Sequence, residues 1–369
     1  MKHLISLLCF FIVFFLSCKK NVPNTDVESE TSKIITLSSI EESFQDTTYF
    51  KKPKITVLET TDESLLTERI DRIITDDSLL FIFDGRLRQV FVFDITGKFI
   101  NKIDRKGQGP NEYVQICDFT IDTDKKQIIL SADIPSKLMY FTYDCVFVKE
   151  EHVPSFFFKL VMDGTFMYAD LYMANEKNQI HILDTEKGIK KGRVSMRNIG
   201  NYVGIKGNTL SRGKDVLFVR RYDNYIYELK NGEITTKYLV NFKNHSFPER
   251  FIKETNENLI FIDSNNYNYI YAMSNAFNSD NYMTFYTNIG IFMYDKNEET
   301  LKGYKKVIIT HLNYVMHYYF FKYYLPLENT GKMVFIVNDP SLIKSIASLP
   351  SDDLMSVSGG KSLAFRRRL

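Results

Sequence analysis

The sequence predicts an all-β fold, and three observations lead to that prediction. The 369-residue chain contains 30 Phe and 23 Tyr but no Trp. Its aromatic and β-branched residues come in short runs that are broken by Asp, Asn and Gly, which is the pattern of strands and turns. No long stretch shows a helical period with caps at both ends. The runs also recur in pairs joined by acidic turns, so the strands are expected to form a repeated unit.

The N-terminus has the pattern of a secretory signal peptide. Met1-Lys2-His3 is a short basic start, and Leu4 to Leu16 is an unbroken apolar run. In a helix that rises ~1.5 Å per residue this run reaches only ~20 Å, which is too short for a hydrocarbon core of ~30 Å. We therefore predict a signal peptide over residues 1–17 rather than a membrane span.

The end of the apolar run carries a possible lipid attachment site. Phe15-Leu16-Ser17-Cys18 resembles the bacterial lipobox, although the lipobox prefers Leu at the position of Phe15. The resemblance implies that Cys18 is lipidated, becomes the mature N-terminus and anchors the protein in a lipid bilayer of the cell envelope. The outer membrane is the expected location, with its periplasmic or surface face left open. The alternative is an apolar run that ends in Cys by chance. Residues 18–33 are polar and predict a flexible tether.

Six strand units are predicted between residues 34 and 345. The clearest has strands at Ser78–Phe83, Gln89–Phe93 and Lys98–Ile103. Acidic turns recur at Asp94, Asp144, Asp184 and Asp295, and the first two steps are 50 and 40 residues. Four-stranded blades of about 45–50 residues have this period, so the sequence predicts a six-bladed β-propeller. A β-sandwich is the rival architecture, but it would not ordinarily reuse one hairpin at this spacing.

Closure of the ring and the C-terminus complete the domain plan. The strand Lys54–Glu59 precedes the first full unit, and we expect it to complete the last blade and so remove an open edge. Residues 346–369 differ in composition from the repeats and end in three arginines and a leucine. We predict a C-terminal tail there, with disorder as one interpretation.

The strand repeats also support a family resemblance. Leu79–Asp84 and Gln89–Gly97 resemble an NHL-type repeat. Together with Lys106–Tyr113 and the lipobox, they make the chain similar to six-bladed β-propeller lipoproteins of Gram-negative anaerobes. The resemblance implies a propeller fold and an envelope location, and it brings no active site to carry over.

Charge and cysteine content narrow the possible partners. Lys and Arg number 47 against 45 Asp and Glu, whereas nucleic-acid binding needs a strong basic excess. We therefore predict no nucleic-acid partner. Beyond Cys9 and Cys18, only Cys117 and Cys145 remain as thiols. Export would permit them to pair, and two separate buried thiols are the alternative.

One loop stands out as a candidate binding site. Gly107-Gln108-Gly109-Pro110 lacks the third glycine and the following helix of a dinucleotide site. The loop is either a structural junction, in which Tyr113 fills the space between blades, or a ligand contact on one propeller face. As a contact it would use four residues: Gln108, Asn111, Glu112 and Tyr113.

Other candidate chemistry is weaker. Asp84, Asp133 and Asp170 lie near strand ends and could ring a channel that binds Ca²⁺, but an Asp there more often caps its own turn. The histidines form no zinc motif, so we predict no metal site and no cofactor. The segment Asn265–Tyr286 is rich in Tyr and Asn, which suits sugar or peptide binding or, alternatively, packing between strands.

The sequence therefore favours a binding or scaffolding module over an enzyme. The expected partner of the tethered propeller is a protein, a peptide or a glycan. The alternative is a propeller hydrolase or lyase with its site at the central channel, because carboxylates brought together from distant positions leave no motif.

Overall fold

The computed structural model describes residues 31–50, 56–76, 78–171, 177–195, 207–248, 268–310, 314–317, 324–330 and 332–335. In these ranges the chain is built of strands, with two single 3-10 turns at Asp46–Thr48 and Lys243–His245. The predicted signal peptide, Cys18 and the predicted C-terminal tail lie outside them. Within the same ranges, no helix has the length and apolar character needed to cross a membrane.

Five units of four strands make up most of the fold, and each is an antiparallel meander of consecutive strands. The first has β2 (Ile70–Asp76), β3 (Leu79–Asp84), β4 (Gln89–Asp94) and β5 (Phe99–Ile103); the second has β6 (Gln115–Asp122), β7 (Gln127–Asp133), β8 (Lys137–Thr142) and β9 (Phe147–His152). The third has β10 (Lys159–Asp163), β11 (Phe166–Asp170), β12 (Asn178–Asp184) and β13 (Ile189–Ser195). The fourth has β14 (Leu210–Arg212), β15 (Val216–Val219), β16 (Tyr225–Lys230) and β17 (Glu233–Asn241), and the fifth has β18 (Met273–Asn278), β19 (Tyr282–Thr287), β20 (Ile291–Asp295) and β21 (Thr300–Ile309).

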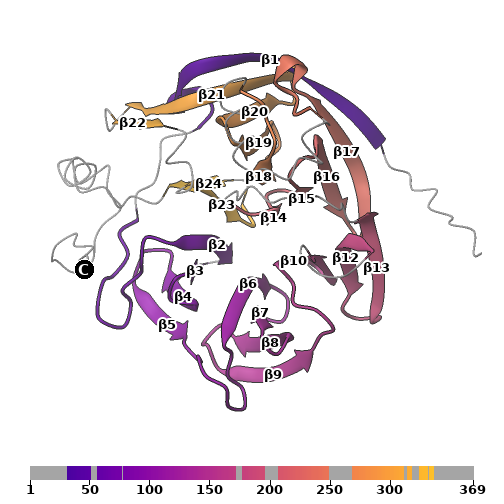
Figure 1. Cartoon of the computed structure of the whole chain (residues 1–369). Coiled ribbons are helices and arrows are strands. Elements are labelled where there is room, and N and C mark those ends of the chain that lie inside the picture. The colour runs from indigo at the N-terminus through magenta and orange to yellow at the C-terminus, as the bar shows by residue number, and fades with distance from the viewer. Residues whose placement is uncertain are drawn as a thin grey trace, which may run out of the picture.

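The units are arranged around a common centre, as in a propeller (Figure 1). The first strand of each unit lies nearest the centre and the fourth lies at the rim. Additional strands link the units into four hydrogen-bonded sheets of ten, four, six and four strands. The predicted all-β, propeller-like fold is thereby confirmed. The four hydrogen-bonded sheets do not by themselves show the predicted six blades.

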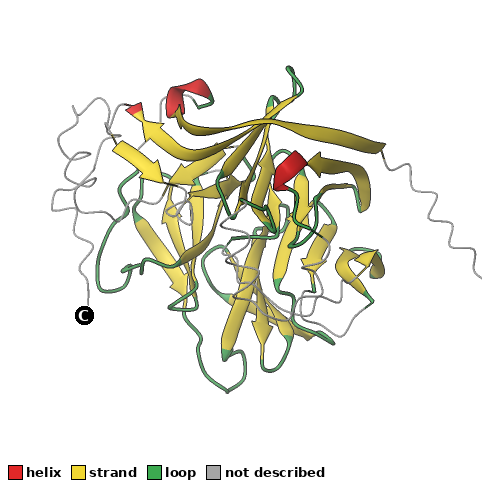
Figure 2. Ribbon diagram, turned by 45° about the horizontal axis from the view of Figure 1, so that its top comes forward, coloured by secondary structure: helices red, strands yellow, loops and turns green. Residues whose placement is uncertain are grey.

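Strand β1 (Thr31–Gln45) joins the fourth and fifth units at the rim. It pairs in parallel first with β17 and then with β21, and it runs across both in Figure 2. Ile35, Leu37 and Phe44 of this strand are buried, so it is part of the body. The predicted tether is therefore too long, since its last three residues, from Thr31 to Lys33, belong to β1.

The prediction that Lys54–Glu59 is a strand that completes the last blade is wrong for the residues that the structure describes. In its described part, residues 56–59, there is no strand. The Glu59 amide donates to the Gly97 carbonyl at 2.7 Å, which ties this segment to the first unit instead of the last. The strand that covers the rim is β1, and its polar sequence concealed it.

A C-terminal hairpin lies against the inner strand of the first unit. It consists of β23 (Tyr324–Glu328) and β24 (Lys332–Phe335), and β23 pairs in parallel with β2. A short strand before it, β22 (Tyr314–His317), pairs with β21. Residues 318–323, between β22 and β23, lie outside the described residues.

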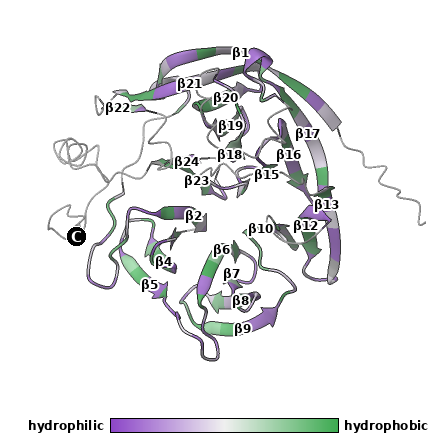
Figure 3. Cartoon of the chain, viewed as in Figure 1, coloured by the Kyte–Doolittle hydropathy of each residue, from purple (hydrophilic) through white to green (hydrophobic). Residues whose placement is uncertain are grey.

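The core is formed where neighbouring sheets face each other. One apolar cluster joins the first and second units and includes Phe81, Phe119 and Phe141, which are fully buried. Equivalent clusters join the second unit to the third and the third to the fourth. Burying a Phe side chain contributes about 1.5–3 kcal/mol, so the sheet contacts are the main source of stability. The outer strand β13 is mostly hydrophilic (Figure 3).

The recurring acidic turns have a common physical cause. Asp94 Oδ1 accepts bonds from the amides of Thr96 at 2.8 Å and Lys98 at 3.0 Å. Asp184 and Asp295 accept from the amides two and three residues ahead in the same way. A carboxylate in this position holds a tight turn that would otherwise leave amides unpaired.

Candidate functional site

The two faces of the ring differ in the chain segments that cross them. Strands one and two of a unit, and strands three and four, are joined by short turns such as 123–126. These turns share one face because successive strands run antiparallel. The links between strands two and three, and between units, lie on the opposite face. Two links between units, residues 196–209 and 242–272, lie partly outside the described residues. We name the faces the turn face and the connection face.

Buried charges meet near the centre of the ring in a network that we call the axial clasp: Arg72, Asp118, Lys159 and Glu328. The Arg72 side chain, from inner strand β2, has no exposed surface. Its Nε donates to Glu328 Oε1 of β23 at 2.7 Å, and its Nη1 donates to Asp118 of β6. The clasp therefore joins the inner strand of the first unit to the second unit and to the C-terminal hairpin.

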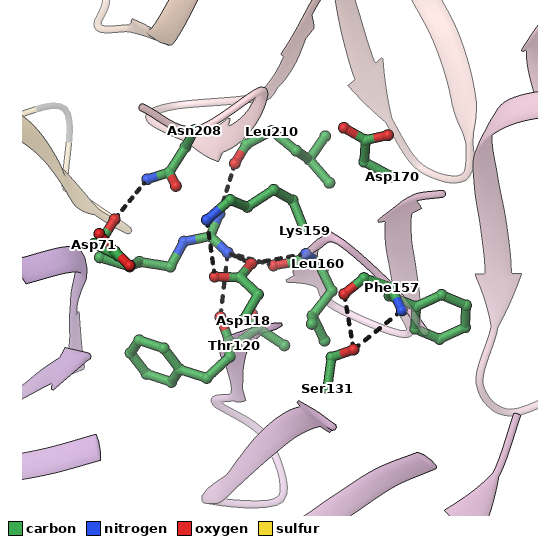
Figure 4. A network of polar contacts seen from close by, with 12 residues as sticks. Asp71, Asp118, Thr120, Ser131, Phe157, Lys159, Leu160, Asp170, Asn208 and Leu210 are labelled. Atoms are coloured by element: carbon green, nitrogen blue, oxygen red, sulfur yellow. Dashed lines mark hydrogen bonds and ion pairs between the residues drawn. The ribbon is translucent and has the colours of Figure 1, made fainter. Parts of the chain in front are cut away.

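The same guanidinium binds backbone carbonyls of three further positions. Nη1 donates to Leu160 O at 2.8 Å and Phe119 O at 3.2 Å, and Nη2 donates to Leu210 O at 2.6 Å. Figure 4 shows Asp118, Leu160 and Leu210 converging on this point. The acceptors belong to β6, β10, β14 and β23, so one side chain ties four other strands to β2.

The charges of the clasp balance. Lys159 Nζ lies 3.5 Å from Asp118 Oδ1 and supplies a second cation against the two carboxylates. Burial lowers the pKa of Arg72, but Asp118 and Glu328 outweigh it, and the net pKa is raised. Burial raises the pKa of Glu328, and Arg72 only partly opposes this. Such a network is strongly destabilised when one member is removed, since the rest remain buried without compensation.

Residues at the connection-face end of the inner strands lie beside the clasp. Register shifts place Asp71 and Cys117 as the extra residues of bulges in β2 and β6. A third shift falls in β18 between Ser274 and Phe277. Asn208 Nδ2 donates to the Asp71 carbonyl at 3.2 Å, and its amide donates to Asn275 Oδ1 at 2.7 Å. Bulges re-aim side chains, and here they direct polar groups into contacts between units.

The predicted binding loop is on the connection face, and some of its polar groups form hydrogen bonds within the loop. Gln108 is exposed, Asn111 and Glu112 are half-buried and Tyr113 is buried. A Glu112 carboxylate oxygen accepts the Gly109 amide at 2.8 Å. The Tyr113 hydroxyl donates to Arg88 O at 2.9 Å, and its ring lies in the core between the first two units. The structural interpretation therefore holds for Tyr113, while Gln108 is placed where a partner could reach it.

The two remaining thiols are not paired. Cys117 is half-buried, Cys145 is buried, and both are free. Burial raises the pKa of each to about 12, with Asp133 and then Asp118 adding to the effect at Cys117 and Asp144 at Cys145. A thiol with such a pKa is protonated at neutral pH and is a poor nucleophile.

The three aspartates considered as metal ligands accept hydrogen bonds from neighbouring protein groups. Asp84 is buried and accepts the amides of Arg86 and Leu87, which caps its own turn. Asp133 accepts the Ile134 amide. Asp170 is bound by Gln179 Nε2 at 3.1 Å and Thr209 Oγ1 at 2.5 Å. Across the part of the chain that the structure describes, no group of three or more His, Cys, Asp or Glu could hold a metal ion.

The tyrosine-rich segment is largely interior. Asn265 and its two neighbours lie outside the described residues, and Tyr271 and Tyr286 are buried. Tyr282 is half-buried, with its ring 5.5 Å from that of Tyr49 in an edge-on arrangement. These three rings pack between strands, as the packing alternative expects.

A comparison with known protein families identifies the family of this chain. The model of a family described as "Domain of unknown function (DUF4934)" matches residues 32–357. The chain belongs to the DUF4934 family. The match starts within β1 and extends beyond β24, so it includes every unit described above. No curated protein matches the chain.

One solved structure supports the fold of this DUF4934 member. A Bacteroides fragilis protein described as a "putative exported protein" has a TM-score of 0.61 at 20% identity, over 74% of this chain and 80% of its own. BamB from Moraxella catarrhalis has a TM-score of 0.42 at 12% identity, over 67% of this chain and 66% of its own. PorZ from Porphyromonas gingivalis has a TM-score of 0.40 at 10% identity, over 66% of this chain and 27% of its own. The similarity to the Bacteroides fragilis protein shows a shared fold.

Proposed function

We propose that this DUF4934 protein is a membrane-anchored envelope lipoprotein whose propeller is a binding or scaffolding module. Its partner, a protein, peptide or glycan, would meet the connection face. The observation that carries the proposal is the axial clasp. The centre of the ring is where the alternative, a hydrolase or lyase, would place its site, but the charged groups there bind each other and backbone carbonyls. Paired buried charges of this kind support a structural role.

The thiol at the same place also favours binding over chemistry. Cys117 is the nucleophile nearest to the clasp in sequence, and its pKa of about 12 opposes formation of the thiolate. Recognition would then fall to the loops, as is usual where strands pack on both faces.

Anchoring rests on the lipobox-like Phe15–Cys18 and on similarity to an exported protein of the same fold. The body begins at Thr31, only 13 positions after Cys18. A lipid anchor at Cys18 would therefore hold the rim strand β1 close to the bilayer. Stable anchoring needs more than one acyl chain, because a single chain binds membranes only marginally.

The count of six blades is part of the same proposal. Five units are complete, and β23 pairs with β2 on the side that a sixth unit would occupy. We assign β23 and β24 to that sixth blade. β23 would then be its inner strand, equivalent to β2 and β6.

The proposal is tested by comparing the two faces in living cells. A photo-crosslinking amino acid is introduced at Gln108, which is exposed on the connection face, or at Asp124, which is exposed in a turn of the opposite face. These positions are matched because each lies in an exposed segment next to β6. Adducts are then identified by mass spectrometry.

The expected result is a recurrent adduct from Gln108 that does not form from Asp124. Adducts from Asp124 alone, or the same adducts from both positions, would contradict the assignment of the connection face. To detect a glycan partner, the protein is purified without crosslinking and the carbohydrate bound to it is analysed.

A further inference from the structure

We propose that the hairpin β23–β24 is a latch, which leaves the centre of the ring as a unit while the five four-stranded units stay folded. The inference rests on how this hairpin is attached, and it does not depend on the proposed function. A latch of this kind would give the ring an open and a closed state.

The backbone attachment of the latch is short. In the described residues β23 pairs with β2 only at Ile73–Leu327 and Ile74–Glu328, and the pairing is parallel. On its other edge β2 pairs with β3 from Ile70 to Asp76. Parallel pairing is slightly less stable per residue than antiparallel pairing, so the edge held by β23 is the weaker of the two.

Polar contacts and apolar packing add to this backbone pairing. Glu328 binds Arg72, and Asn329 Nδ2 donates to the Thr75 carbonyl at 3.1 Å. The Asn329 amide reaches the carbonyl of Arg212 in β14 at 3.4 Å. Among the described side chains of β23 and β24, Leu325 is buried in the apolar core of the first unit, Leu327 and Val334 are partly buried there, and Met333 packs against the core of the fifth unit.

The clasp is built so that opening does not strand its central cation. Without Glu328, Arg72 keeps Asp118 and the carbonyls of Leu160 and Leu210. Glu328 would meanwhile regain water, which relieves the burial that raises its pKa. Opening leaves Arg72 and Lys159 facing Asp118 alone, but it costs less than unfolding, in which Arg72 would also lose Asp118 and both carbonyls.

The test is hydrogen exchange measured by mass spectrometry on the mature full-length chain. We expect amides of β23 and β24 to exchange at least about tenfold faster than those of β7, which lies inside the second unit. Glu328→Gln leaves two cations facing one carboxylate, so it should speed exchange of the hairpin by a further tenfold or about that. Exchange in β7 should change by less than about twofold.

Two further variants make the result decisive. Glu233→Gln is the matched control, since Glu233 pairs with Lys191 and Arg193 at the rim, and it should leave exchange of the hairpin unchanged. Ile73→Cys with Leu327→Cys joins the register pair of β2 and β23. Once oxidised, this variant should slow hairpin exchange to the rate of β7, and reduction should restore it.

The proposal is overturned if β23 and β24 exchange as slowly as β7 in the unmodified protein. It is also overturned if Glu328→Gln speeds exchange equally in all units, because the hairpin would then open only with the whole fold. The disulfide variant keeps the test available should Glu328→Gln fail to fold.

Discussion

Arg72 and Glu328 are 256 positions apart in the chain and form an ion pair with 2.7 Å between Arg72 Nε and Glu328 Oε1. Both side chains are buried, so the pair is shielded from solvent and salt. It links the first complete unit to the C-terminal hairpin across the centre of the ring. Near the axis the hairpin is therefore held in part by an ion pair, while at the rim β1 joins the fourth and fifth units.

The rim strand β1 should be necessary for stability in spite of its polar sequence. Ile35 is 2% exposed and its neighbour Ile34 is 72% exposed. We expect Ile35→Ala to lower the free energy of unfolding by about 2–4 kcal/mol, through lost burial and the cavity left behind. Ile34→Ala, the matched control, should change it by no more than about 0.5 kcal/mol. Urea denaturation measures both, and equal losses would mean that β1 does not dock as described.

The loop at Gly107–Tyr113 should respond differently to two sets of substitutions. Replacing Gln108, Asn111 and Glu112 together by Ala removes the Glu112 contact with Gly109 and places Ala at position 111, where φ is +59°. These changes should cost about 1–2 kcal/mol, because an Ala is strained at positive φ and a loop amide loses its acceptor. Gln108→Ala alone should leave thermal stability unchanged and reduce only partner capture. A triple variant of full stability would show that the loop is not self-supporting.

The thiols should be slow to react in the folded protein. With pKa values of about 12, Cys117 and Cys145 are almost fully protonated at pH 8. Allowing for the higher nucleophilicity of a basic thiolate, alkylation should be at least about 100-fold slower than for a free cysteine. Burial is the main cause of the raised pKa of both thiols, so unfolding in urea should restore the ordinary rate of alkylation. Rapid labelling of Cys117 in the native state would reopen a chemical role for the channel.

Lipidation at Cys18 is tested by Cys18→Ser. We expect the variant to remain an unprocessed precursor or to leave the membrane fraction, because the anchor has no attachment point. Fractionation and intact-mass measurement report both outcomes. Normal processing together with continued membrane binding would exclude the lipoprotein interpretation.

The repeating hairpins could be predicted from the sequence because their information is local. Runs such as Gln89–Phe93 and the turn at Asp94 specify strand and turn within a few residues, and the structure has them in β4 and the turn after it. Strand β1 was missed because its alternation of buried and exposed residues is irregular and its partners are distant in sequence. Residues 56–59 were assigned to the wrong end of the ring for the same reason.

The axial clasp left no pattern to find. Arg72, Asp118 and Glu328 stand in different units, and each alone looks like an ordinary charge in a strand. The alignment of the units does carry a hint, since Arg72 and Asp118 each lie one residue after a bulge in an inner strand. Of the two alternatives given for the glycine-rich loop, the burial of Tyr113 between the first two units fits the structural junction rather than a ligand contact by Tyr113.

The most direct test of the account is a double-mutant cycle on Arg72 and Glu328, measured by urea unfolding. Arg72→Met should cost about 3–5 kcal/mol, because Glu328 would stay buried without its cation and Asp118 would keep only Lys159. The double variant with Glu328→Gln should lose less than the sum of the single losses, with a coupling of about 1 kcal/mol or more. Losses that add within about 0.5 kcal/mol would contradict the account. The charges at the centre would then not hold the ring together, and they would again be candidates for catalysis.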